Sequence, residues 1–539
     1  MKEESGITKE ENAVAQKGGT LKLDFKRTIL VGFAFFGIMC FWEVYDYIMP
    51  LILNTRFGLN SWQYGLIMGL DNLLAIFLLP LFGSLSDKSK GGKMGRRTKF
   101  IFWGTIAAAV AILILSIFEF VQFKKIMDAG YSDINKLMEF NDKLKDLLTN
   151  RQDVTDFLTQ KNINLDYNSL SKLSSLKGLN EAQAIIVADI SLAIKDAQIA
   201  MGASMVRSNA WVLVMFIVSL LMLLVAMASY RSPAVSLMPD ITPKPLRSQA
   251  NALITFMGGA GGVVAIVLYK VFANTPTKNY LFLFISLAVV LLIVLLVYML
   301  TVKENKFVEL REEEEQKYNV VDEEEAEGTD KLPKAKLVSL FLILMTVFLW
   351  FMGYNAVKSH LSTYATRMLN FTQGYVGTLS ILNGAGGAIA LLPVALLANK
   401  LGRKKTVIIG VIVAALAFIP CFFMKATTPG VKYLFPLCYL LAGFGMVCVN
   451  VNTLPMVTEL SRGSTVGKYT GYYYAFSMSA QAVTPAFAGI FMDKISQSTV
   501  FIYASIFIGL ALVTTAFIKH GDNKPPKKKK MLEYFSDED

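Results

Sequence analysis

The chain of 539 residues contains only two histidines and four cysteines. Neither residue type shows the spacing that a metal site needs, so no metal is expected. The cysteines all fall within apolar stretches and are expected to be buried thiols rather than disulfides: Cys40, Cys421, Cys438 and Cys448.

The sequence also lacks the usual signatures of catalysis. No loop of the form Gly-x-x-x-x-Gly-Lys-Ser/Thr occurs, which argues against ATP as the source of energy. No nucleophile stands near a base in a pattern that suggests hydrolysis or redox chemistry. The sequence therefore predicts neither an enzyme nor a resident cofactor.

Charge is scarce as well, at 17% of residues against 54% hydrophobic. A soluble protein carries about a quarter charged residues, so this composition indicates a lipid bilayer as the solvent. Twelve stretches are long enough to cross about 30 Å of hydrocarbon as helices. Their even apolarity excludes the alternation of a membrane β-barrel. An all-α polytopic membrane protein is expected, with helices near 27–50, 61–86, 98–122, 207–230, 249–272, 279–302, 337–357, 373–398, 404–424, 432–457, 468–492 and 499–519.

One short basic turn occurs twice, at residues 83–99 and 395–406. Each copy follows an apolar helix, contains Gly-Arg-(Arg or Lys), and leads into another apolar helix. This repetition indicates duplication, and parallel repeats are typical of a large class of secondary transporters. We expect two six-helix bundles, at 25–302 and 337–519.

The basic turns also predict orientation, because lysine and arginine concentrate in cytoplasmic loops. Both termini are then cytoplasmic: a disordered segment at 1–24, and a tail at 520–539 that is first basic and then acidic. The formal charge of +12 follows from the same rule and does not require nucleic acid as a partner. The lysine-rich composition favours the cytoplasmic membrane of a bacterium.

Two segments interrupt the helical pattern. Residues 124–206 show apolar positions at helical spacing and are expected to form an extracytoplasmic helical insertion. It could serve gating, partner binding or a lid, or it could be a neutral addition. Residues 303–336 are strongly acidic and are expected to be a solvated cytoplasmic linker, with a regulatory element as the alternative.

The first basic turn and the helix before it resemble the major facilitator superfamily, whose motif is G-x-x-x-D-(K/R)-…-G-R-(K/R). The longer form P-x-x-G-x-x-S-D-…-G-R-R-x-x-F-I resembles the sucrose–proton and glycoside-pentoside-hexuronide symporters. It matches here at Pro80, Gly83, Ser86, Asp87, Gly95, Arg96, Arg97, Phe100 and Ile101. The resemblance covers the whole membrane portion and implies the major facilitator fold, with twelve helices in two bundles.

A second patch resembles the R-A-L-x-A-D-…-R-x-x-A-N-A motif of those families. The matching residues are Asp240, Arg247, Ala250, Asn251 and Ala252. The sequence departs from the family where the first arginine falls on Val235. Arg231 lies one helical turn earlier and is a candidate replacement.

Asp87 stands among cations at the end of a helix. It could pair with Arg96 or Arg97, or with the positive N-terminus of a neighbouring helix, and so tie two helix ends together. The alternative is that these loops only fix the topology. The candidates for a conformational latch are Gly83, Asp87, Gly95, Arg96, Arg97, Arg231, Asp240 and Arg247.

Three carboxylates lie within predicted helices: Glu43, Asp46 and Asp71. A charge at membrane depth costs roughly 2.5–3.5 kcal/mol on insertion scales, so each is a candidate for carrying a coupling proton. The alternatives are a structural hydrogen bond to Asn72 for Asp71, and a position at the wet rim for Asp46.

A solute site is expected at the midplane between the bundles. Aromatic residues and amides on facing helices suit a carbohydrate, because ring faces pack on Trp or Tyr while hydroxyls need hydrogen-bond partners. Packing is the alternative for each residue singly. The candidates are Trp42, Tyr45, Trp350, Tyr354, Asn355, Asn450, Asn452, Tyr473 and Gln481.

The sequence thus favours a monomeric secondary transporter that takes up a sugar or glycoside together with a proton or sodium ion. Two other functions stay open. The same architecture could export a drug or metabolite by proton antiport. A non-transporting receptor could instead sense a ligand through the insertion.

Overall fold

The computed structural model describes residues 21–522 except 174–175, 177, 244–245, 273–278, 319–332 and 461–465. Most of the expected tails, 1–24 and 520–539, and part of the expected acidic linker, 303–336, lie outside this range. The described residues form helices and no strands. Eleven of these helices are long and apolar enough to cross a membrane, and a twelfth, α15 (Gln373–Leu401), contains a shorter apolar stretch, Ile389–Leu401. All four cysteines are free and buried, as expected.

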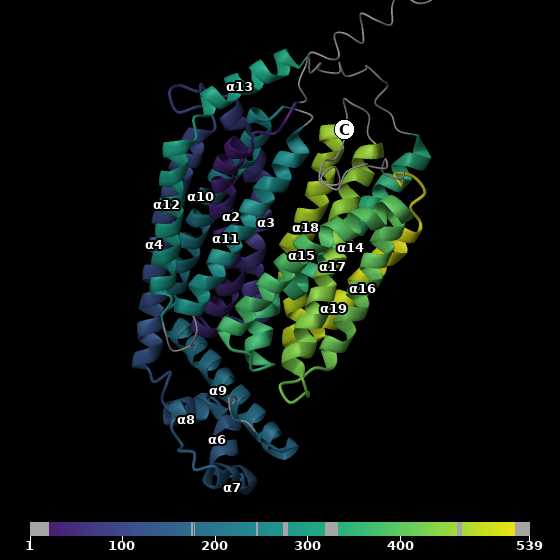
Figure 1. The fold of residues 1–539 in the computed structure, drawn as a ribbon. Helices are drawn as coiled ribbons and strands as arrows, with labels where there is room; N and C mark the ends of the chain where they lie inside the picture. The colour runs from purple at the N-terminus through teal and green to yellow at the C-terminus, as the bar shows by residue number, and fades with distance from the viewer. Residues whose placement is uncertain are drawn as a thin grey trace, which may run out of the picture.

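The helices form two bundles that lie side by side (Figure 1). The first bundle, the N-bundle, contains α2 (Phe25–Leu51) with its π-helical end η1 (Ile52–Arg56), α3 (Ser61–Asp87), α4 (Thr98–Asp128), α10 (Trp211–Ile241), α11 (Arg247–Phe272) and α12 (Leu281–Thr301). The second, the C-bundle, contains α14 (Lys334–Arg367), α15, α16 (Arg403–Phe423), α17 (Val431–Leu460), α18 (Val466–Lys494) and α19 (Thr499–Ala516).

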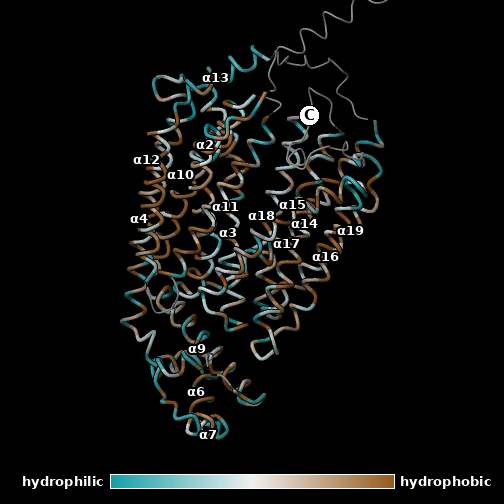
Figure 2. Tube along the Cα trace, viewed as in Figure 1, coloured by the Kyte–Doolittle hydropathy of each residue, from teal (hydrophilic) through white to brown (hydrophobic). Residues whose placement is uncertain are grey.

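The helices of both bundles are hydrophobic along most of their length (Figure 2). On α4, for example, Trp103, Val110 and Ile117 recur every seven residues and are all exposed. A seven-residue repeat places side chains on one face of a helix. Such a face requires an apolar solvent, which is what lipid supplies.

Three helices continue well past their predicted ends. The helix predicted to end at residue 122 reaches Asp128, the one predicted to end at 230 reaches Ile241, and the one predicted to end at 357 reaches Arg367. Hydropathy marks only the apolar part of a helix, whereas the backbone remains helical beyond it. As a result, Arg231 and Lys358 lie inside helices rather than at their ends.

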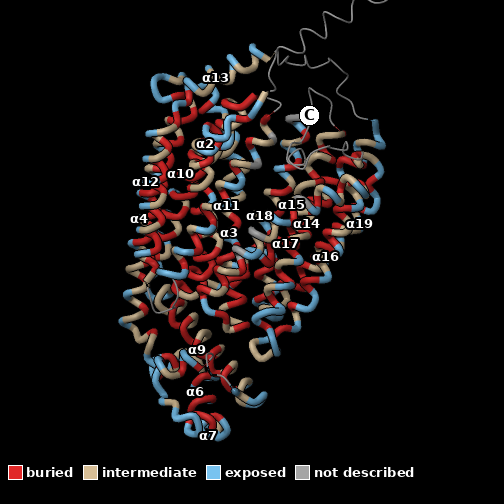
Figure 3. Tube along the Cα trace, in the orientation of Figure 1, coloured by how far each residue is buried: buried red, intermediate tan, exposed pale blue. Residues whose placement is uncertain are grey.

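The segment between α4 and α10 forms five helices at one end of the molecule: α5 (Ile134–Glu139), α6 (Asp142–Thr149), α7 (Gln152–Gln160), α8 (Tyr167–Ser171) and α9 (Glu181–Ser208). They enclose a small apolar core of their own, which includes Leu137, Leu144 and Ile190 (Figure 3). We call this end of the molecule the insertion end.

The opposite end carries α13 (Glu304–Lys317), which begins directly after the N-bundle, and we call it the linker end (Figure 1). The first part of the expected acidic linker is therefore a helix. Its first residue, Glu304, is buried although it is a carboxylate. Arg27 of α2 forms an ion pair of 2.7 Å with Glu314, which holds α13 against the N-bundle.

The two bundles are in close contact at the insertion end. The Asp493 carboxylate of α18 accepts hydrogen bonds from the backbone N–H groups of Ser61 (3.0 Å) and Trp62 (2.9 Å), so it caps the N-terminus of α3. Gly65 and Gly69 of α3 then lie against backbone carbonyls of α18, where a Cβ would not fit.

Toward the linker end this contact is lost. Seven residues of α3 are buried, and six of them lie between Ser61 and Gly69. Further along, Leu73, Phe77 and Leu81 of α3 and Tyr474 of α18 are exposed. The bundles are thus closed against each other at the insertion end and apart at the linker end.

Candidate functional site

Among the described residues, one ion pair joins a helix of the N-bundle to a helix of the C-bundle, in the part of both helices nearer the insertion end. Lys358 of α14 and Asp46 of α2 approach to 2.8 Å, with 49% and 30% of their side chains exposed. The exposure shows that the pair borders an open space rather than a packed core. An interbundle ion pair in this position can respond both to a bound solute and to relative movement of the bundles.

Two further carboxylates share this site. Glu43 lies one helical turn from Asp46 and interacts electrostatically with both Lys358 and Asp46. Asp71 of α3 likewise interacts electrostatically with Asp46 and Lys358. It accepts hydrogen bonds from the backbone and side-chain nitrogens of Asn72, at 2.6 and 2.7 Å. The three carboxylates predicted from the sequence are therefore brought together.

Aromatic side chains of α2 form one wall of the site. Trp42 and Tyr45 meet edge to face with their ring centroids 5.3 Å apart. The Arg231 guanidinium of α10 lies 5.7 Å from the centre of the Trp42 ring, a cation–π distance. The Trp42 Nε1 and the Tyr45 hydroxyl are buried, and neither finds a hydrogen-bond partner among the described residues. Unused buried donors beside a charged cluster are available for a solute.

The candidates on α14 face the same cluster less directly. Trp350 is fully buried and stacks on Tyr354 at 5.6 Å. The Tyr354 hydroxyl exchanges hydrogen bonds with Asn383, whose Nδ2 donates to it over 2.9 Å. Tyr354 still interacts electrostatically with Lys358, so it adjoins the site while holding α14 to α15.

Most of the remaining solute candidates are engaged within the C-bundle. Asn355 Nδ2 donates to the Gln481 carbonyl (3.4 Å), and Gln481 Nε2 donates to the Ser477 carbonyl (3.3 Å). Asn452 donates to the Cys448 carbonyl (2.8 Å), and Tyr473 is hydrogen-bonded to Thr453 (3.2 Å). The exception is Asn450, whose buried Oδ1 has no partner among the described residues.

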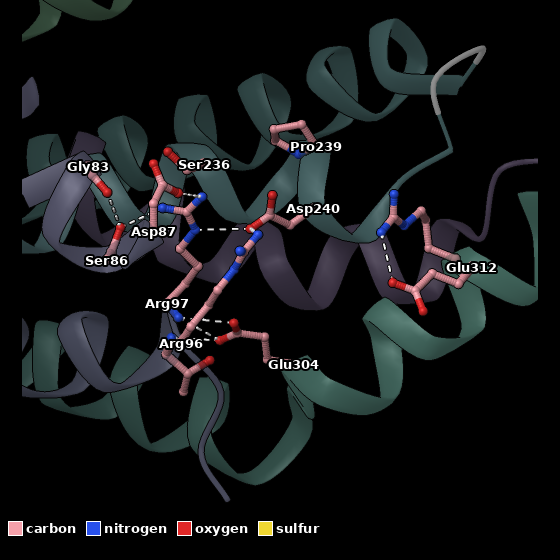
Figure 4. Close-up of polar contacts among 12 residues, drawn as sticks. Gly83, Ser86, Asp87, Arg96, Arg97, Ser236, Pro239, Asp240, Glu304 and Glu312 are labelled. Carbon is pink, nitrogen blue, oxygen red and sulfur yellow. Dashed lines mark hydrogen bonds and ion pairs between the residues drawn. The ribbon is translucent and has the colours of Figure 1, made fainter. Parts of the chain in front are cut away.

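A second polar cluster lies at the linker end of the N-bundle (Figure 4). The Arg97 side chain forms ion pairs with Asp87 and with Asp240 (3.0 Å), and it also donates to the Ser86 hydroxyl. Arg96 reaches the same Asp240 oxygen at 2.8 Å. These contacts tie the ends of α3 and α10 to the start of α4.

Glu304 completes this cluster from α13. Its carboxylate accepts the backbone N–H groups of Arg97 (3.0 Å) and Thr98 (2.7 Å), at the positive end of α4 (Figure 4). Gly95 has a φ of +96°, and a Cβ there would overlap the Glu304 side chain. The glycine of the motif is thus required by both its backbone angle and its neighbour.

Three other residues expected at the latch lie as follows. Gly83 accepts a hydrogen bond from the Ser86 hydroxyl at 2.8 Å (Figure 4). Arg247 donates to the Pro239 carbonyl at 3.1 Å and so holds the end of α10. Arg231 lies apart from this cluster, beside Trp42, because α10 continues ten positions beyond it to Ile241.

The C-bundle repeats this arrangement with different residues. Arg403 pairs with Glu459 at 2.9 Å, as the arginines of the first turn pair with Asp240. Asp522 follows α19 and accepts the backbone N–H of Lys404 at 2.7 Å, as Glu304 follows α12 and caps α4. The two halves therefore share a mechanism for fixing helix ends, which is what a duplicated chain would retain.

The sequence reasoning missed three residues that join the bundles. One is Lys358, which was placed just past the predicted end of its helix. The others are Tyr64 of α3 and His360 of α14. His360 Nε2 donates to the Pro485 carbonyl (2.9 Å), so its Nδ1 accepts from the Tyr64 hydroxyl (2.6 Å). Ionisable residues in the last turns of α14 were the available signal. No group of three or more His, Cys, Asp or Glu side chains suited to a metal occurs in the described ranges.

Comparisons of the sequence identify relatives of this chain. The model of the Major Facilitator Superfamily matches residues 197–376 and 365–535. The chain is also similar to the α-ketoglutarate permease of Escherichia coli, with 28% identity over 113 residues. That match spans 20% of this chain and a quarter of the permease.

Solved structures share the fold at low sequence identity. A peptide transporter in complex with sulfate has a TM-score of 0.58 and 12% identity, covering 94% of this chain and 97% of its own. A D-xylose–proton symporter has a TM-score of 0.53 and 14% identity, covering 92% of this chain and 98% of its own. At these identities the similarity establishes the twelve-helix fold alone.

Proposed function

The chain belongs to the Major Facilitator Superfamily, and we propose that it is a symporter that couples uptake of a sugar or glycoside to protons. The family makes it a multi-pass membrane transporter of a small molecule and not an enzyme. The identity of the solute and of the coupling ion is the proposed part.

The observation that carries the coupling proposal is the interbundle pair of Lys358 and Asp46 beside Glu43 and Asp71. The three carboxylates face two cations, Lys358 and Arg231, which leaves one excess negative charge at membrane depth that a single proton would neutralise. A carboxylate that binds a proton from one side and releases it to the other is the minimum requirement for proton coupling. We assign this role to Asp71 first, because the hydrogen bonds that it accepts among the described residues come from its neighbour Asn72.

The proposed solute follows from the wall formed by Trp42 and Tyr45. Their rings offer a flat apolar surface, and their unused N–H and O–H groups can bond to hydroxyls. Asn450 adds an unused carbonyl oxygen from the C-bundle. A polar organic molecule with both a hydrophobic face and several hydroxyls fits this combination, as a sugar or glycoside does.

We further propose that the linker end is cytoplasmic, since the basic turns gather there. The protein would then lie as a monomer in the cell membrane of a bacterium, and the observed conformation would open to the cytoplasm. In this orientation the cluster of Asp87, Arg97 and Asp240 acts as a latch whose contacts change between states. Changed labelling of engineered cysteines at the two ends in Asp87→Asn tests this; unchanged labelling would leave only a role in topology.

The experiment is pyranine fluorescence in proteoliposomes that contain the wild-type protein and are challenged with mono- and disaccharides and glycosides. Acidification of the lumen on addition of one sugar is expected. Asp71→Asn should abolish concentrative uptake of that sugar and spare its downhill exchange. Asp189→Asn makes the same chemical change on the insertion and is expected to behave as wild type.

The other outcomes are distinct. Alkalinisation of the lumen on addition of the sugar would indicate proton antiport rather than symport. Sugar uptake that requires sodium and causes no pH change would identify sodium, rather than the proton, as the coupling ion. Binding of a sugar without any flux would support the alternative of a non-transporting receptor. An Asp71→Asn variant that accumulates the sugar normally would remove Asp71 from the coupling step.

A further inference from the structure

The helical insertion contacts both bundles, and the contact runs through one helix, α9. On the N-bundle side, Gly202 of α9 lies so close to the chain after α2 that a Cβ there would be 2.9 Å from the Arg56 carbonyl oxygen. Gly58 packs even more closely against Ala203, where a Cβ would be 2.2 Å from the backbone nitrogen. These backbone-to-backbone contacts fix α9 to the N-bundle.

Further contacts around Arg56 hold the insertion to the N-bundle. The Arg56 guanidinium lies 4.7, 5.4 and 5.3 Å from the ring centres of Phe123, Tyr131 and Tyr280, which come from α4, the insertion and the residue before α12. Gln122 Nε2 donates to the Arg56 carbonyl at 2.9 Å. The insertion therefore moves together with the N-bundle.

On its other side, α9 reaches the C-bundle through two adjacent charged residues. Lys195 Nζ donates to the Thr366 carbonyl (2.7 Å) and to the Asn370 side-chain oxygen. Asp196 accepts from Arg367 at 2.8–2.9 Å. Thr366 and Arg367 form the last turn of α14, and Asn370 lies in the connection to α15. All of these bonds join the insertion to the C-bundle.

The junction also contains a polar cavity that is large enough for water. The cavity has a volume of about 250 Å³ and is lined by Ile199 of α9, Arg367, Asp493 and four other residues. Side chains at such a junction can exchange a protein partner for water at modest free-energy cost. These contacts can therefore form and break during a transport cycle.

A major facilitator transporter works by moving its bundles relative to each other around a central site. Opening at the insertion end would separate α9 from the end of α14, so the bonds of Lys195 and Asp196 exist only while that end is closed. An interaction present in one of two states shifts the population toward that state. We propose that the insertion is a brace, in which Lys195 and Asp196 of α9 hold the insertion end closed and set the balance between the two transport states.

The test measures distances in the whole protein and needs no solute. Spin labels at Ser208→Cys and Lys425→Cys report the insertion end, since both residues are exposed; Ser208 ends α9, which is fixed to the N-bundle, and Lys425 follows α16 of the C-bundle. Labels at Lys88→Cys and Lys400→Cys report the linker end. The native cysteines are buried, which keeps the labels specific.

Asp196→Asn removes the partner of Arg367 and leaves two cations, Lys195 and Arg367, facing each other. Double electron–electron resonance should then show a rise of about fivefold in the long-distance population at the insertion end, with shortening at the linker end. The matched control is Asp189→Asn, on the same helix, whose partner Lys143 (3.8 Å) belongs to the insertion itself. The control should match wild type.

A second experiment forces the brace closed. Lys195→Cys combined with Asn370→Cys is linked by a short bis-methanethiosulfonate reagent, which should hold the insertion-end distance at its short value and stop flux of the transported solute until a thiol reductant is added. Unchanged distance distributions in Asp196→Asn, or normal exchange by the linked protein, would overturn the brace. Because the distances do not depend on the solute or the coupling ion, they separate this inference from the proposed sugar–proton symport.

Discussion

Lys358 and Asp46 lie 2.8 Å apart across the boundary between the two bundles, with much of each side chain exposed to the space between them. Partly exposed ion pairs contribute only about 0–1 kcal/mol to stability. The pair therefore contributes little to the free energy of unfolding, so stability does not explain why it is present. Its position, between the two bundles and beside two more carboxylates, points to the transport cycle instead.

The first prediction concerns this pair. Lys358→Met and Asp46→Asn should each lower concentrative uptake by at least about tenfold, because each removes one partner of the interbundle pair and leaves the other without it. The double variant should recover part of the loss, since it contains neither charge. Uptake in proteoliposomes measures all three, and melting temperatures should stay close to wild type. Losses that simply add in the double variant would show that the two residues act separately.

Much of the fold could be predicted from the sequence, because apolar length and a repeated basic turn are properties of local sequence. The exact ends of the helices could not. Lys358 fell outside the predicted helix because polar residues follow residue 357, although the backbone stays helical to Arg367. An intramembrane lysine was therefore overlooked as a partner for Asp46.

Contacts between segments that are distant in the sequence also could not be predicted from it. Glu304 looks like any residue of an acidic linker, yet it is buried because it caps α4. Gly65 and Gly69 form a Gly-x-x-x-Gly pattern, which signals close helix contact, but the pattern does not say which helix is contacted. Of the predicted solute residues, Trp42, Tyr45 and Asn450 have polar atoms without a hydrogen-bond partner among the described residues, while most of the others form hydrogen bonds within the C-bundle.

The second prediction tests the close contact of α3 and α18. In Gly69→Ala the added methyl would overlap the Ala482 carbonyl oxygen of α18. Forcing extra volume into a packed contact costs about 1–3 kcal/mol, so the closed insertion end should become less populated by roughly tenfold. The spin-label pair at Ser208 and Lys425 measures this. Gly471→Ala is the control, because a Cβ at Gly471 meets nothing within 4 Å.

The third prediction concerns the cap on α4. Glu304→Gln keeps the shape of the side chain but removes the charge at a helix N-terminus and weakens two hydrogen bonds to backbone N–H groups. Unfolding in detergent should become easier by about 1–2 kcal/mol, visible as a lower melting temperature. Glu313→Gln, at an exposed position of the same helix, should change little. Equal losses in the two variants would contradict a specific cap.

The fourth prediction follows from the environment of Lys195, outside the membrane-spanning helices. Burial lowers the pKa of its ammonium from 10.5 to about 8; Asp196 opposes this shift and Arg367 adds to it. If the insertion end opens, Lys195 returns to water and its pKa returns toward 10.5. The closed state therefore binds this proton less tightly than the open state, so raising the pH through 8 favours closure.

The closed population at the insertion end should thus rise between pH 7.5 and 9.5, by up to about tenfold per pH unit for one proton. The deprotonated amine still donates to the Thr366 carbonyl, so the brace survives the loss of charge. Spin-label distances across this pH range provide the measurement. Lys195→Met has no proton to release at this position and should flatten the response. A closed population that falls as the pH rises, or a response unchanged in Lys195→Met, would show that another group controls this end of the protein.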